Sequence, residues 1–319
     1  MAKLPKITDL PANTSGWGFF LCTRKDLRSG RTGNEFLEIA LQDISGEIRA
    51  KVFQDVDAIK HEFDAGEFVK VQGRSNLFQG RIELILERIR RVIPDQDAKD
   101  GFREEDCIQC APRPVDEMWT ELASRIDSVQ DPALRALLAH MVDRHRDRLR
   151  IWPAARQIHH AYRSGLLEHI LQIMEVSAFL ADRYGARRDL LIAGALLHDI
   201  GKLRELSYET ATDYTVEGNL VGHITIGVGM LKDAIREVPG ISPDLQVELE
   251  HLILSHHGAL ELGSPVAPMT VEAFLLAAVD DLDAKLHQIR RHIADDDSPG
   301  PFTSVNRRLE RALLKPRSS

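Results

Sequence analysis

The amino-acid sequence predicts two domains of different class: an N-terminal all-β barrel over residues 1–93 and an all-α domain over residues 116–319, with a linker over residues 94–115. The 319 residues exceed the roughly 100 to 200 residues of a typical single domain. Apolar and polar residues alternate along residues 17–92, as in β-strands. From Asp116 onward apolar residues recur at spacings of three and four, as in helices.

Five strands and one short helix are expected in the first domain. The alternation is clearest in FLEIALQD and EFVKVQG, and Gly-containing turns at residues 43–47 and 76–81 separate strands as hairpin connections. The segment DVDAIKHEF, residues 55–63, predicts a short helix between the third and fourth strands. This order of elements is that of an OB-fold barrel, which binds oligonucleotides on one face.

Aromatic and basic side chains of this barrel are the candidate nucleic-acid contacts, because aromatic faces stack on bases and cations neutralise phosphates. Trp17 and Phe78 are the substrate-binding candidates here, and Phe78 leads because it lies at a predicted hairpin tip. A purely structural role stays open for each, since a small barrel also needs inward-facing aromatic residues. The wider set comprises Phe19, Phe53, Arg24, Lys25, Arg28, Arg31, Arg74 and Arg81.

Composition is typical of a globular protein, with 43% hydrophobic and 28% charged residues. The longest apolar runs, residues 190–197 and 273–279, are far shorter than the about 18 residues of a membrane span. The first residues, MAKLPKITDL, lack an apolar signal-peptide core, so we expect a cytoplasmic protein with no membrane partner. Three cysteines are too few for a disulfide framework, and Cys107 with Cys110 lacks the second ligand pair of a structural zinc site.

The net charge of −8 is unevenly distributed. Residues 1–93 carry 15 Lys/Arg and 13 Asp/Glu, so the rest of the chain carries a net −10. A polyanionic ligand must therefore meet a local basic surface or metal ions. The segment from Pro301 holds five Lys/Arg and one Glu, and contact with substrate, contact with a neighbouring subunit and a solvated helix all stay open for it.

Polar residues that interrupt the apolar pattern of the helices point to the chemistry. His169 lies within LLEHILQI, and His198 with Asp199 ends the run LLIAGALLHDIGK. Burying an unpartnered charge costs several kcal/mol, on the order of 3 to 5. A metal ion removes this cost, and imidazole nitrogens and carboxylate oxygens suit manganese, iron, zinc or magnesium.

A single histidine in such a place is more often a hydrogen-bonded core residue than a ligand. The set is more informative, because its members lie on different apolar segments that can converge inward, as helical folds build metal sites. The remaining members are His223 in GHITIG, His256 in SHHG and Asp280 in AAVDDLDAK.

These motifs resemble the HD superfamily of phosphohydrolases, whose signature is a His, a His-Asp doublet and a distant Asp, over residues 150–290. With an OB barrel in front, the stretches HHAYRSGLLEH, LLHDIGK, EGNLVGHITIG, SHHG and AVDDLDAK resemble more narrowly the YhaM-type 3′-to-5′ exoribonucleases. The resemblance covers nearly the full length of the chain.

The resemblance implies a divalent metal centre that removes nucleotides hydrolytically from the 3′ end of RNA or single-stranded DNA. It implies one ion held by His169, His198, Asp199 and Asp280, and a second completed by His223 and His256 with Asp199 bridging. His257 is either a further ligand or a hydrogen-bond donor to the site. Mn²⁺ is the expected metal, with Mg²⁺, Co²⁺ or Fe²⁺ as alternatives, and several relatives form homo-oligomers.

The expected mechanism assigns catalytic roles to Asp199 and Lys202. Bound metal lowers the pKa of water from 15.7 toward about 7, and a cation must then meet the phosphate. Lys202 in HDIGK is placed for that contact, and His160 and Arg163 are further substrate-binding candidates. Two alternatives stay open: a phosphohydrolase for a free or signalling nucleotide, and a non-catalytic protein that binds single-stranded nucleic acid.

Overall fold

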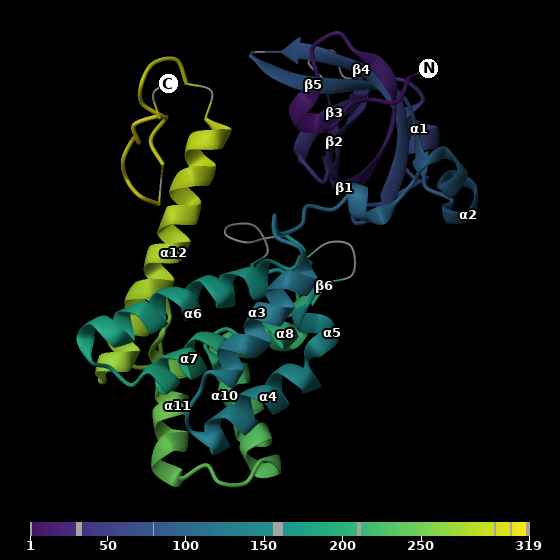
Figure 1. The fold of residues 1–319 in the computed structure, drawn as a ribbon. Coiled ribbons are helices and arrows are strands. Elements are labelled where there is room, and N and C mark those ends of the chain that lie inside the picture. The colour runs from purple at the N-terminus through teal and green to yellow at the C-terminus, as the bar shows by residue number, and fades with distance from the viewer. Residues whose placement is uncertain are drawn as a thin grey trace. The chain divides into compact units, whose positions relative to one another are not determined.

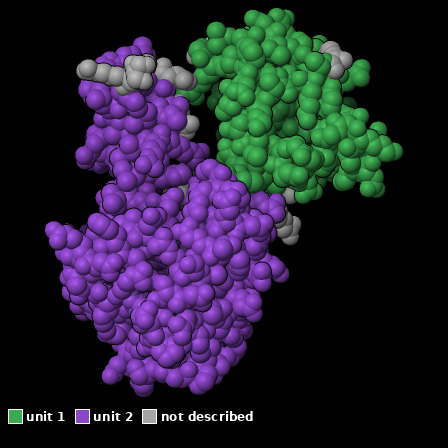
Figure 2. All heavy atoms as spheres, in the orientation of Figure 1, with its two compact units in different colours: residues 1–110, 209–211 green, residues 111–208, 212–319 purple. Residues whose placement is uncertain are grey.

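The computed structural model describes residues 2–29, 34–78, 80–155, 162–208, 212–296, 298–306 and 308–316, without the side chain of residue 295. The described chain divides into two compact units, one ending at Cys110 and the other beginning at Ala111 (Figure 2). Each unit has a hydrophobic core of its own.

The first unit is a closed five-stranded barrel with the strand order β1-β2-β3-β5-β4 (Figure 1). A short helix lies between the third and fourth strands, so the predicted order of elements is confirmed. All neighbouring strands are antiparallel except β3 and β5, which are parallel. The elements are β1 (Ser15–Ser29), β2 (Glu35–Asp43), β3 (Gly46–Val52), α1 (Val56–Ile59), β4 (Phe68–Phe78) and β5 (Arg81–Arg91), preceded by the 3-10 turn Ile7–Asp9.

The barrel closes because β1 is long enough to pair with two strands. Its first half pairs with β4, its second half with β2, and the register shifts between Cys22 and Arg24. Alternate residues such as Leu37, Ile39 and Leu41 point inward and are fully buried, as their period-two pattern predicted.

Residues 94–110 pack onto the barrel, so the segment expected as linker over residues 94–115 is already structured over most of its length. It contains α2 (Pro94–Asp97) and two 3-10 turns, Ala98–Asp100 and Glu104–Asp106. The buried Asp97 carboxylate accepts two hydrogen bonds of 2.7 Å from Arg90, and Phe102 and Cys107 pack against Phe19. Burial raises the pKa of the Cys107 thiol to about 12, so this cysteine is a packing residue of the barrel unit.

The second unit is helical, as predicted. Its core is built from residues of all the long helices, and α7 is buried from Leu190 to its end at Leu197. Its helices are α3 (Val115–Asp127), α4 (Pro132–Arg144), α5 (Arg146–Leu149), α6 (Gly165–Tyr184), α7 (Arg188–Leu197), α8 (Lys202–Glu205), α9 (Val216–Val221), α10 (His223–Glu237), α11 (Pro243–Ser255) and α12 (Val271–Asp295), with the 3-10 turn Leu260–Leu262 before α12.

Two details differ from the all-α prediction. A two-stranded sheet, β6 (Leu206–Tyr208) paired with β7 (Thr212–Tyr214), interrupts the helices. The described residues after α12 form no helix, and isolated bridges join Phe302 to Leu314 and Asn306 to Arg311. In the part of the chain that the structure describes, no helix is both long enough and apolar enough to cross a membrane.

Candidate metal centre

Five helices of the second unit bring together the six residues that the sequence singled out. His169 lies in the second turn of α6, and Asp280 lies midway along α12. The others stand where helices begin or end: His198 and Asp199 follow α7, His223 begins α10 and His256 follows α11. Residues more than one hundred positions apart in the sequence therefore share one buried site.

The first group of donor atoms comes from His169, His198 and Asp280. The Nε2 atoms of the two histidines are 3.2 Å apart, and His169 Nε2 is 3.2 Å from Asp280 Oδ1. Ligands bound to one ion at about 2.1 Å lie roughly 3 to 3.5 Å from one another, which matches this spacing.

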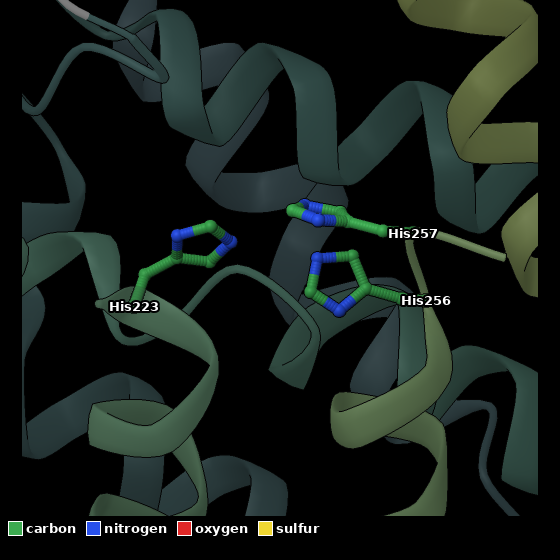
Figure 3. A group of neighbouring side chains, drawn as sticks. All are labelled: His223, His256 and His257. Atoms are coloured by element: carbon green, nitrogen blue, oxygen red, sulfur yellow. The ribbon is translucent and has the colours of Figure 1, made fainter. Parts of the chain in front are cut away.

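The second group comes from His223, His256 and His257, whose rings lie close together at an angle to one another (Figure 3). His223 reaches in from the start of α10, and the two neighbouring histidines reach in from the turn after α11. Nε2 of His223 and Nε2 of His256 are buried and have no hydrogen-bond partner among the described residues. Buried polar atoms are rarely left without a partner, so this space fits a ligand that accepts nitrogen lone pairs.

Asp199 stands between the two groups. Its Oδ2 is 3.4 Å from His198 Nε2 and 3.5 Å from His169 Nε2, whereas its Oδ1 is 3.5 Å from His223 Nε2 and 3.7 Å from His256 Nε2. One carboxylate oxygen thus faces each group, which is the arrangement of a bridging ligand.

All five histidines use Nδ1 for a hydrogen bond to an oxygen, which leaves Nε2 as the donor toward a metal. His169 Nδ1 donates to Asp283 and His223 Nδ1 donates to Glu205, each at 2.9 Å. The other three donate to the backbone carbonyls of Ala195, Ile253 and Leu262. Such outer partners fix the tautomer and ring orientation of metal-binding histidines. The residues present therefore fit a divalent metal.

Carboxylates beside the first donor group favour a positive charge within it. Burial lowers the pKa of His169, but hydrogen bonds to Asp280 and Asp283 outweigh burial and raise this pKa to about 9. Burial raises the pKa of the Asp199 carboxyl, yet Lys202 and His198 hold it well below its ordinary value. In the second group, burial lowers the pKa of His256 and of His257, so both imidazoles are neutral and able to bind metal.

Lys202 lies directly beside the carboxylate of Asp199. Its Nζ donates to Asp199 Oδ2 at 2.5 Å. Burial lowers the pKa of Lys202, but the charge of Asp199 outweighs burial and raises it, so the side chain is positively charged. Arg163 lies half-buried just before α6, and its backbone carbonyl accepts a hydrogen bond from Ala111. His160, the other predicted substrate contact of this segment, lies outside the described residues.

The aromatic candidates of the barrel differ in exposure. Phe78 is 48% exposed at the end of β4, and Lys51 Nζ lies 4.7 Å from its ring centroid. Phe53 is 54% exposed and stacks beside Phe36 with centroids 5.4 Å apart. Trp17 is half-buried and packs edge-to-face on Phe19, so less of its ring is open to a base.

Two carboxylates of the site were missed by sequence reasoning, Asp283 and Glu205. Asp283 lies three residues after Asp280, one helical turn away on the same face of α12, so helix periodicity could have found it. Glu205 accepts hydrogen bonds from both the backbone nitrogen and Nδ1 of His223. No local pattern relates these two residues, because the contact depends on how α8 packs against α10.

A glycine in the turn after Asp199 holds α10 close enough for His223 to reach the site. A Cβ on Gly201 would lie 1.9 Å from the carbonyl oxygen of His223 and 2.7 Å from the nitrogen of Gly227. Gly201→Ala is therefore expected to lower the free energy of unfolding by about 1 to 3 kcal/mol and to weaken metal binding at His223. Chemical denaturation and metal titration measure the two effects.

Gly229→Ala is the matched control, because a Cβ there meets nothing within 4 Å and the residue lies inside α10. This change should stabilise the helix by up to about 1 kcal/mol and leave metal binding unchanged. Equal behaviour of the two variants would show that the contact between the turn and α10 does not position His223.

Comparison with known proteins agrees with the fold of both units. Residues 22–92 match the OB-fold nucleic acid binding domain, and residues 166–285 match the HD domain. The chain is thus an HD-domain protein with an N-terminal OB-fold barrel, and the HD domain implies that it binds divalent metal.

Full-length relatives define the family. The chain is 37% identical over 286 residues to the 3′-5′ exoribonuclease YhaM of Bacillus subtilis, an alignment that covers 89% of each protein. It is 36% identical over 300 residues to YhaM of Bacillus velezensis, covering 93% of this chain and 94% of that one. The chain belongs to the YhaM family of 3′-5′ exoribonucleases.

Proposed function

We propose that this protein is a metal-dependent 3′-to-5′ exonuclease that hydrolyses phosphodiester bonds of RNA or single-stranded DNA. The observation that carries the proposal is the pair of donor groups on either side of Asp199, built from histidines whose Nδ1 atoms are all engaged elsewhere. The names of the relatives and the match of the barrel to a nucleic-acid-binding domain support the substrate class.

In this proposal His169, His198, Asp199 and Asp280 hold one ion. His223 and His256 hold a second, with Asp199 shared. Mn²⁺ is the metal we propose, with Mg²⁺, Co²⁺ and Fe²⁺ as alternatives, because a set that includes two carboxylates suits ions of this kind. When bound, such ions lower the pKa of water and stabilise negative charge on the phosphate.

The side chains of the protein supply the remaining functions. Lys202 stays protonated beside Asp199 and can donate a hydrogen bond to a non-bridging phosphate oxygen. Arg163, and in the segment not described His160, are proposed to bind the phosphate backbone next to the scissile bond. Phe78 and Trp17 of the barrel are proposed to stack on bases of the single strand.

Two further parts of the proposal concern where and how the protein works. Cys22 and Cys107 are buried thiols outside any disulfide, which supports a reducing, cytoplasmic location. Phe179 on α6 and Phe274 on α12 are 68% and 67% exposed, which supports self-association, because large exposed apolar side chains often mark contact surfaces.

Degradation of 5′-labelled RNA and DNA oligomers tests the proposed activity. With Mn²⁺ we expect stepwise shortening from the 3′ end and release of mononucleotides, and slower hydrolysis of free nucleotides. Absence of shortening with both oligomers in Mn²⁺, Mg²⁺, Co²⁺ and Fe²⁺ would contradict the exonuclease and leave the two alternatives, a phosphohydrolase for free nucleotides and a non-catalytic binding protein. Preferred cleavage of a free nucleotide would support the phosphohydrolase alternative. The family membership favours neither.

A further inference from the structure

The two donor groups differ in chemistry, and we infer that they select different metals. We propose that His223, His256 and His257 form an all-imidazole position that prefers Zn²⁺ and Co²⁺ over Mn²⁺ and Mg²⁺, with Glu205 as its positioning residue. The inference rests on the proposed metal centre and assigns His257 to it as a ligand.

Geometry places the three imidazoles around one point. Their donor atoms lie within 4.8 Å of one another. The ring centroids of His256 and His257 are 4.4 Å apart, and that of His223 is 5.3 Å from His257 and 5.6 Å from His256 (Figure 3). By ring centroids, His257 is as close to His223 as His256 is, although the printed contacts of Asp199 Oδ1 are to His223 and His256.

Each of the three rings is held in place by a hydrogen bond from its Nδ1 atom. Nδ1 of His256 donates to the Ile253 carbonyl at 2.7 Å, and Nδ1 of His257 donates to the Leu262 carbonyl at 3.0 Å. Glu205 does the same for His223, and its carboxylate also accepts the backbone N–H of that residue. Each ring therefore presents Nε2, the neutral imidazole donor that zinc sites use.

Negative charge is concentrated on the other side of Asp199. There Asp280 lies 3.2 Å from His169, and Asp283 bonds the same ring from behind. Of the described carboxylates, Asp199 alone turns an oxygen toward the Nε2 atoms of the imidazole position, with Oδ1 3.5 Å from His223 Nε2. Carboxylate oxygens suit Mn²⁺ and Mg²⁺, whereas imidazole suits Zn²⁺, Fe²⁺ and Ni²⁺, and Co²⁺ generally binds a given site more tightly than Mn²⁺ does. The carboxylate-rich position should therefore fill with Mn²⁺, and the imidazole position should remain weak for Mn²⁺ and Mg²⁺.

Metal titration of the metal-free full-length protein tests this assignment. We expect one zinc equivalent at the imidazole position, and we expect the ratio of Zn²⁺ affinity to Mn²⁺ affinity to be at least tenfold larger there than at the carboxylate-rich position. His257→Ala should weaken that zinc equivalent by tenfold or more, and Glu205→Gln by about tenfold, as for other outer partners of metal ligands. Tight Mn²⁺ binding at the carboxylate-rich position should change less than twofold in both variants.

Controls separate a metal ligand from a structural role. His61→Ala removes an exposed histidine of the barrel and should leave both metals unaffected. Asp283 is the outer partner of His169 in the other donor group, so Asp283→Asn should weaken the binding of Mn²⁺ rather than that of Zn²⁺. Thermal melting checks that each variant is folded, and if His257→Ala unfolds, Glu205→Gln gives the same selective readout.

Equal loss of both metals in His257→Ala and Glu205→Gln, or zinc affinity unchanged in both, would overturn the inference. The result is independent of turnover. An inactive protein with the expected zinc selectivity would contradict the proposed exonuclease but not this assignment. An active protein without that selectivity would contradict this assignment but not the proposed exonuclease.

Discussion

Asp199→Asn is expected to reduce the turnover number for nucleotide release on the order of a thousandfold or more. Among the residues that the structure describes, the change removes the one carboxylate that faces both donor groups, so it weakens both metal positions at once. Bound metal lowers the activation free energy of hydrolysis by several kcal/mol, and a change of about 4 kcal/mol alters the rate about a thousandfold. A single-turnover assay with labelled RNA and saturating Mn²⁺ measures the loss.

Binding of the oligomer should survive this substitution, since the barrel is untouched. Fluorescence anisotropy with labelled single strands is expected to change less than a few-fold. Asp281→Asn is the matched control, because this exposed aspartate of α12 pairs with Lys285 outside the site and should retain full turnover. Asp280→Asn serves as a second variant, because Asp199→Asn leaves the buried Lys202 without its partner and is itself destabilising. Full activity in both site variants would exclude the metal centre proposed here.

Removal of the barrel is expected to have the second-largest effect. A protein that begins at Ala111 should lose about a hundredfold in kcat/KM on a single-stranded oligomer, since each base stacked on an aromatic ring contributes about 1 to 3 kcal/mol. Hydrolysis of a small chromogenic phosphodiester should stay within a few-fold. Comparative kinetics of the two substrates, with circular dichroism to verify folding, measures the difference.

Point variants of the full chain provide the complementary test. Phe53→Ala combined with Phe78→Ala removes two exposed aromatic rings and should weaken oligomer binding by at least about tenfold. Phe302→Ala, an equally exposed phenylalanine of the C-terminal segment, should have no effect. Unchanged degradation of oligomers by both the shortened protein and the double variant would show that the barrel does not hold the substrate.

The barrel could be predicted from sequence because period-two alternation, hairpin turns and the position of one short helix specify it together. The path of residues 94–110 could not, because Phe102 and Cys107 are isolated apolar residues in a charged segment, with no periodicity to indicate burial. Asp97 likewise resembles an ordinary acidic linker residue in the sequence, because only the fold brings Arg90 beside its carboxylate.

The ligand candidates could be found because an ionisable residue inside an apolar helix is conspicuous, as His169 and His198 are. The outer carboxylates could be found only in part. Asp283 follows from the periodicity of α12, but the contact of Glu205 with His223 depends on the close approach of α10 to the turn before α8, which Gly201 permits. Tertiary packing of this kind leaves no local signal in the sequence.

Metal analysis combined with an activity assay tests the central claim most directly. The protein is stripped of metal with a chelator, and Mn²⁺ is then added stepwise while bound metal and nucleotide release from 5′-labelled RNA are measured on the same samples. We expect no release from the stripped protein, and release that rises in proportion to the metal bound and is absent in Asp199→Asn. Nucleotide release from the metal-free protein at the rate of the loaded one would contradict a metal centre built on His169, His198, Asp199 and Asp280.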